Sequence, residues 1–183
     1  LRPNIEPEGL NSKADLVAAR ACHLNAVRDA LDAADVVVFT LGLTESWVDE
    51  KTGVAFPVAP GILADPPTGL DVRFHNFIFT EIWDDFTLAR AALKELRPDL
   101  RILLTVSPVP LVATATGNHV AIANSHSKSV LRAVCGEACT QFDDVDYFPS
   151  YEIITAPMSR GRFFASNKRS VTPEGVDTVM DVF

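Results

Sequence analysis

Several features that would direct a protein to a particular functional class are scarce in this chain of 183 residues. No apolar run approaches the roughly twenty residues of a membrane-spanning helix, so we expect no membrane span. Basic residues are few, 16 against 24 acidic ones, and a net charge of −8 argues against a nucleic-acid partner. No Gly-rich phosphate loop is present, so we expect no nucleotide and no other cofactor.

Cysteine is also scarce, and the three present are too few for a disulfide framework. Cys135 and Cys139 lie four apart on a predicted helix, Ser129–Thr140, and therefore share one face. A metal pair and two buried thiols are the alternatives, and no second Cys or His pair has suitable spacing. We expect buried thiols and no metal site. Free thiols favour a reducing compartment, which predicts a cytoplasmic protein, although the chain starts at Leu1 without an initiator Met.

What the chain does have is enough apolar sequence, 48% of its residues, to bury one substantial core. We therefore expect a single domain over residues 1–183, with a hairpin and a Pro-rich loop at 46–70. The hairpin is predicted over Ser46–Val58, turning at Lys51–Gly53, and the loop over Pro57–Thr68.

Hydrophobic patterning predicts helices that alternate with strands. The strands expected are Val36–Leu41, Arg101–Val106 and Val145–Phe148. The helices expected are one capped by Asn11 or Ser12 and running to about Ala33, then Phe77–Leu96, Ala121–Gln141, and one that Thr172 caps and Pro173 begins.

This order predicts an α/β fold with a parallel sheet covered by helices on both faces. Val36–Leu41 is an unbroken run of apolar and β-branched residues, which is typical of a strand buried on both faces. Doubly wound domains normally open with a strand, whereas this chain opens with a helix. We therefore expect at least one further strand upstream of Leu1.

The segment after the first strand is the strongest candidate for a site. Ligands of open α/β sheets bind just beyond the carboxyl ends of the strands. There the chain places Gly42, Thr44, Glu45 and Trp47 in quick succession. A capped turn is the alternative interpretation. For Trp47, substrate binding and packing in the core are the alternatives. Ser107 ends the second strand at the same edge, where a substrate-lining role is expected rather than nucleophilic attack.

Several longer stretches resemble the GSCFA domain family and together span nearly the whole chain. They are Arg2–Gly9, Phe39–Trp47, Phe74–Phe77, Leu104–Leu111, Ala123–Arg132, Asp146–Glu152 and Ser170–Asp177. That family is similar to the SGNH/GDSL hydrolases, which implies a flavodoxin-like, three-layer α/β/α sandwich. In those enzymes a serine after the first strand attacks an ester, a histidine is its base, and nearby donors hold the oxyanion. The GSCFA motif itself does not occur in these residues, so the resemblance implies a serine nucleophile upstream of Leu1.

Two blocks depart from the hydrolase pattern. Gly42-Leu43-Thr44-Glu45 matches a Gly-x-Asn-Asp block, and Thr44 replaces the amide that donates to the oxyanion, although its hydroxyl can still donate once. The Asp-x-x-His-Pro block matches Asn167–Val171, where Asn167 and Ser170 replace the acid and the base. The usual triad cannot be assembled from this second block.

A different histidine could supply the base. His75, just before the second helix, is the candidate general base, with Glu45 as the group that orients it. A hydrogen-bonded packing role is the alternative for His75. For His119 and His126 we expect solvent exposure or local capping, and for His23 a structural role.

The sequence leaves three functional hypotheses open. The first is an ester hydrolase or O-acyl transferase acting on an acylated small molecule or glycan, such as a polysaccharide. The second is a degenerate domain that binds such a ligand without turnover. The third is an interaction module of a larger protein. The sequence predicts no oligomeric state.

Overall fold

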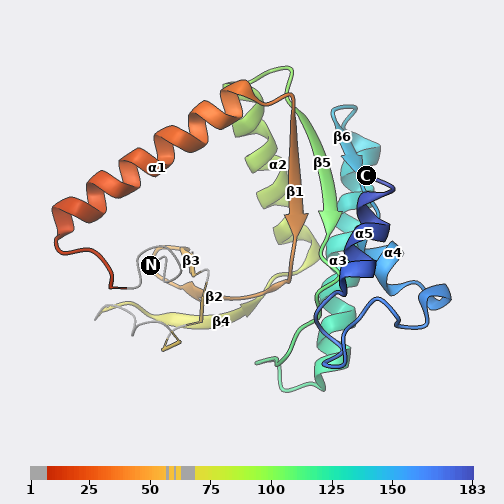
Figure 1. Cartoon of the computed structure of the whole chain (residues 1–183). Helices are drawn as coiled ribbons and strands as arrows, with labels where there is room; N and C mark the ends of the chain where they lie inside the picture. The colour runs from red at the N-terminus through yellow and green to blue at the C-terminus, as the bar shows by residue number, and fades with distance from the viewer. Residues whose placement is uncertain (1–7, 57, 60, 63–68) are drawn as a thin grey trace.

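The computed structural model describes residues 8–56, 58–59, 61–62 and 69–183. Its helices and strands follow one another along the chain as Figure 1 shows. They are α1 (Lys13–Ala33), β1 (Val36–Leu41), β2 (Glu45–Asp49), β3 (Ala55–Phe56), β4 (Val72–Asn76), α2 (Phe79–Leu96), β5 (Arg101–Val106), α3 (Val120–Gln141), β6 (Val145–Tyr147), α4 (Ser150–Thr155), a 3₁₀ turn (Pro157–Ser159) and α5 (Pro173–Met180).

The main sheet is parallel, with strand order β1-β5-β6. Alternate side chains of β5 face opposite layers of the molecule, as the pleat of a strand requires. Ile102, Leu104 and Val106 are buried in one core cluster with residues of α2 and α3. Thr105 points the other way, where its hydroxyl lies 2.6 Å from that of Ser150 in α4. Helices on both faces of a parallel sheet make this a three-layer α/β/α fold, as the sequence predicted.

A second, antiparallel sheet leaves the end of β1 as a ribbon, in the order β3-β2-β4. It contains the predicted hairpin, in which β2 pairs with β3 and Gly53 takes a positive φ of 70° at the turn. The strand β4 was not predicted, although Val72–Asn76 begins with the apolar–polar alternation of a half-exposed strand. Most of the predicted Pro-rich loop, Pro57–Thr68, lies outside the described residues.

The prediction that Val36–Leu41 is buried on both faces was wrong. Within the described residues β1 pairs only with β5 and forms an edge of the sheet. Val36 and Val38 are each 50% exposed, and Phe39 is 48% exposed. Helix α1 begins after its Ser12 cap as expected, but none of its residues is buried and it extends away from the sheet (Figure 1). An apolar run thus identified the strand correctly but not its surroundings.

The cysteine prediction was half right. Cys135 is buried beneath α3, where removal from water raises the pKa of its thiol to about 12, whereas Cys139 is exposed. Although the two residues are about one helical turn apart, only Cys135 lies in the core. In the described part of the chain, no helix is both long enough and apolar enough to cross a bilayer.

Candidate functional site

The carboxyl ends of β1 and β5 form one rim of the parallel sheet. Leu41 is in register with Val106, so the chain leaves the two strands side by side at Gly42 and Ser107. The N–H of Ser107 donates to the carbonyl of Leu41 across this rim at 2.9 Å. The two segments that carry the predicted site residues after β1 and β5 therefore start beside each other.

Thr44 is the most tightly held residue of this rim and is 1% exposed. Its N–H donates to the hydroxyl of Ser127 at 2.8 Å, and its own hydroxyl donates to Asn76 at 2.6 Å. Its carbonyl accepts from the N–H of Phe77 at 2.9 Å. Both donors that Thr44 offers are thus engaged inside the fold, where they join β1 to α3 and to the ribbon.

Gly42 is held from the same helix. The ammonium of Lys128 donates to the Gly42 carbonyl at 2.8 Å, although the two residues are 86 positions apart. Lys128 is 1% exposed, and its removal from water lowers the pKa of the amine to about 8. Neither Ser127 nor Lys128 was a candidate from the sequence. The helical spacing of the buried set could have identified Ser127, because Ala123, Ser127, Leu131 and Cys135 recur every four residues.

Glu45 does not orient His75, contrary to the sequence-based prediction. Glu45 is paired with Asn76 across β2 and β4, and His75 is paired with Ser46. Directly paired residues share a face and neighbours alternate, so Glu45 and His75 lie on opposite faces of the ribbon. Glu45 instead accepts from the hydroxyl of Thr114 at 2.6 Å, which ties the loop after β5 to β2.

His75 has a different carboxylate partner, Glu81, in the first turn of α2. The Nε2 atom of His75 lies 3.0 Å from the Glu81 carboxylate, and both side chains are about 40% exposed, at 41% and 39%. The Ile78 N–H is the main cause that lowers the pKa of Glu81, and the hydrogen bond with His75 acts in the same direction. An ionised carboxylate only accepts, so Nε2 carries a hydrogen and Nδ1 is the basic nitrogen of the neutral ring.

Ser107 and Trp47, the two residues predicted to line a substrate site, contact different parts of the fold. Ser107 is half-buried at the rim, and its hydroxyl accepts from the N–H of Val109 at 3.2 Å. Trp47 packs edge-on against Phe74 on the ribbon, with ring centroids 5.8 Å apart. Ser107 therefore belongs to the sheet rim, and Trp47 to the ribbon that leaves it.

Of the remaining histidines, His119 and His126 behave as expected, whereas His23 is exposed on α1, which buries none of its residues. His119 caps α3, because its Nδ1 accepts from the N–H of Ala121 at 3.2 Å, and His126 is exposed.

With this geometry established, comparison with known families gives one match. The model of the GSCFA family matches residues 6–183. The chain belongs to the GSCFA family. Neither the curated proteins nor the solved structures contain a match to it.

The last block of this GSCFA domain forms a closed turn. The side-chain oxygen of Asn167 accepts from the N–H groups of Arg169 and Ser170, both at 2.9 Å, and its amide donates to the Ser170 hydroxyl at 2.9 Å. These exposed residues satisfy one another. Asn167 and Ser170, which the sequence comparison predicted to replace an acid and a base, close an Asx-type turn instead.

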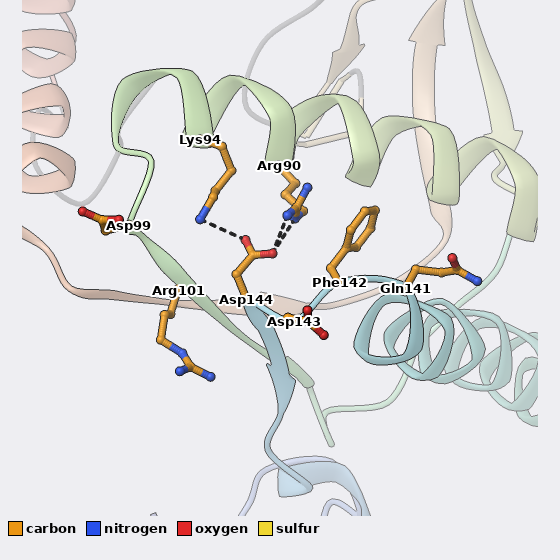
Figure 2. Close-up of a pocket in the computed structure, with 8 residues that line it drawn as sticks. All are labelled: Arg90, Lys94, Asp99, Arg101, Gln141, Phe142, Asp143 and Asp144. Atoms are coloured by element: carbon orange, nitrogen blue, oxygen red, sulfur yellow. Dashed lines mark hydrogen bonds and ion pairs between the residues drawn. The ribbon is translucent and has the colours of Figure 1, made fainter.

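A hollow of about 540 Å³ lies at the opposite rim of the sheet, near the amino ends of β5 and β6. Figure 2 shows Asp144 between Arg90 and Lys94, which reach it from α2. The carboxylate of Asp144 pairs with both cations and so joins α2 to the start of β6. The hollow therefore lies away from the carboxyl ends of the strands, where an α/β sheet binds its ligands.

Proposed function

We propose that this GSCFA-family domain takes part in ester hydrolysis or O-acyl transfer on an acylated substrate, with acylated carbohydrates as a candidate class. The serine nucleophile is expected upstream of Leu1, as the family resemblance implies. The observation that supports this function best is the His75–Glu81 pair, an imidazole with a carboxylate partner at 3.0 Å. A carboxylate that holds one ring nitrogen leaves the other to accept a proton from a hydroxyl nucleophile.

The position of the pair also favours this role. His75 lies on β4, and Phe77, two residues later, is bonded to Thr44 at the rim of the main sheet. The segment from His75 to Phe77 thus connects the histidine to the rim within two residues. The free edge of β1, with Val36 and Val38 half exposed, is where we place the expected upstream strand and its serine.

The test is hydrolysis of a short-chain aryl acetate by the full-length protein. We expect His75→Ala to lower kcat/KM by about 100-fold or more, because general-base catalysis typically contributes that much. Glu81→Gln should cause a smaller loss, since it removes the orienting charge and keeps the histidine. His126→Ala is the matched control, because His126 is an exposed histidine of α3, and its activity should equal that of the wild type.

Activity that survives His75→Ala would exclude this histidine from the mechanism. A serine-directed fluorophosphonate should label the full-length protein if the proposed nucleophile is present and activated.

A second function, ligand binding without turnover, is favoured by two observations. The Asn167–Ser170 block forms a self-satisfied turn, and both donors of Thr44 are engaged within the fold. This alternative predicts no aryl acetate hydrolysis and no fluorophosphonate labelling. It also predicts saturable binding of an acetylated oligosaccharide in calorimetry, with the acetyl group unchanged afterwards.

A further inference from the structure

Helix α3 holds the segment after β1 by two adjacent side chains that the proposed mechanism does not use. Lys128 donates to the Gly42 carbonyl at 2.8 Å, and Ser127 accepts from the Thr44 N–H at 2.8 Å. Ser127 is 0% exposed and Lys128 is 1% exposed. Both peptide groups that flank Leu43 are therefore fixed from the same side.

The burial of a charged lysine at this position is unfavourable in free energy. Within the described residues no charged partner affects the pKa of Lys128, and its ammonium donates to a backbone carbonyl. Burial of an amine without a counter-charge destabilises the folded state, which is why the pKa of this amine falls to about 8. A purely structural contact with a carbonyl could be made by a neutral side chain at lower cost.

The geometry of the peptide bond links this lysine to the rim. The Gly42–Leu43 peptide is trans, as are all the peptide bonds described, so its carbonyl and its N–H point in opposite directions. The carbonyl points to Lys128 inside the protein, and the Leu43 N–H therefore points away from it. This N–H donates to no acceptor among the described residues, and Leu43 is 43% exposed directly beyond the carboxyl end of β1.

A hydrogen bond to the oxygen of an amide also changes its nitrogen. An ammonium at the carbonyl draws electron density through the peptide and makes the N–H a stronger donor. Backbone N–H groups held in a fixed direction are the usual donors to the oxygen of an ester that gains negative charge during attack.

We propose that the Leu43 N–H is an oxyanion donor of this site and that Lys128 is the positioning residue that aims and polarises it. This inference rests on the proposed acyl-transfer function, and it assigns the donor role to the Gly42–Leu43 peptide rather than to the Thr44 hydroxyl. The ligand group is the carbonyl oxygen of the ester, which becomes an oxyanion when the nucleophile adds to the carbonyl carbon.

The kinetic test compares four variants of the full-length protein. Lys128→Met removes the ammonium and keeps the apolar stem, while Leu43→Pro deletes the proposed donor and leaves Lys128 in place. The matched control is Lys94→Met, because Lys94 also donates to a backbone carbonyl, that of Leu100 at 3.0 Å, but at the opposite rim of the sheet. Lys128→Arg is the conservative fourth variant.

We expect Lys128→Met and Leu43→Pro to lower kcat on an aryl acetate by about 10- to 100-fold with little change in KM, as loss of a transition-state donor does. Lys128→Arg should recover part of the loss because it restores a cation near the Gly42 carbonyl. Lys94→Met should retain wild-type kcat. A folded Leu43→Pro variant with full activity would overturn the proposal, and so would wild-type kcat in Lys128→Met.

A second measurement separates this inference from the proposed function. In ¹⁵N–¹H spectra of the wild type, methylphosphonate should shift the Leu43 amide resonance, because its anionic oxygens imitate the oxyanion. The shift should be absent in Lys128→Met and present in Lys94→Met. If the wild type shows no turnover, the acyl-transfer function fails, yet this titration still decides whether Leu43 is an anion donor. No shift at Leu43 in the wild type would overturn the donor assignment.

Discussion

Lys128 shows how a single buried charge makes stability depend on pH. Its amine ionises with a pKa of about 8 in the folded protein, below the ordinary value of 10.5 that applies to the unfolded chain. Between these two values the unfolded state binds more protons than the folded state, so the free energy of unfolding rises with pH. Below pH 8 both states are protonated and the full penalty of burial applies.

We therefore expect wild-type protein to gain stability relative to Lys128→Met as the pH rises from about 8 to 10.5. The gain should reach at most about 3 kcal/mol, since each unit of pKa difference corresponds to about 1.4 kcal/mol. Urea unfolding of both proteins across this range measures it, and subtraction removes the contribution of other alkaline groups. A difference in stability that stays constant from pH 7 to 10.5 would contradict the depressed pKa of Lys128.

At the scale of elements, the docking of α5 depends on a residue without a side chain. Gly175 lies in the first turn of α5, which Thr172 caps by accepting from the Gly175 N–H at 3.2 Å. A Cβ at this position would lie 2.8 Å from Val171, 3.0 Å from Phe163 and 3.2 Å from Ile154 of α4. The close approach of α5 to its neighbours therefore requires glycine here.

We expect Gly175→Ala to destabilise the domain by about 1–3 kcal/mol, because overpacking at a rigid contact forces its neighbours to move. Gly136→Ala in α3 is the matched control. Its Cβ would meet only the flexible end of Arg132, so the better helix propensity of alanine should leave stability unchanged or raised by up to about 1 kcal/mol. Thermal unfolding of the two variants measures the contrast, and equal shifts would contradict the close packing at Gly175.

At the scale of the whole molecule, Asp144 joins helix α2 to the start of β6. Its carboxylate lies 3.3 Å from the Lys94 ammonium and also accepts from Arg90, whose guanidinium lies over the ring of Phe142. Desolvation raises the pKa of Asp144, but the hydrogen bonds and charges of Arg90 and Lys94 outweigh it and lower the pKa overall. A lowered carboxyl pKa means stability that is present above the unfolded pKa of 3.8 and lost as the pH falls through the folded value.

Asp144→Asn should therefore destabilise the protein by about 3 kcal/mol near neutral pH, since it leaves two partly buried cations without their partner. The difference from the wild type should shrink as the pH falls below 3.8, where the wild-type carboxyl itself becomes protonated. Asp146→Asn is the control, because its pair with Arg101 is 65% and 58% exposed and should contribute little. A pH-independent effect of Asp144→Asn would show that charge is not the cause.

The secondary structure of this chain was largely predictable because its signals are local. The strand Arg101–Val106 and the Thr172 cap with Pro173 lie where the sequence placed them, and the helix expected over Ala121–Gln141 begins one residue earlier. Apolar runs, caps and prolines act on the residues beside them, so they can be read without the fold. The strand β4 was missed because a five-residue alternation is a weak signal beside a long loop.

By itself, the sequence determined the α/β layers, the rim at Gly42 and Ser107, and membership of the GSCFA family. Only the tertiary structure decided which side chains meet there. It paired His75 with Glu81 rather than Glu45, and placed Lys128 on the Gly42 carbonyl. It also left one side of β1 exposed. These contacts and this exposure depend on strand register and on helices distant in the chain, and neither is encoded in the spacing of neighbouring residues.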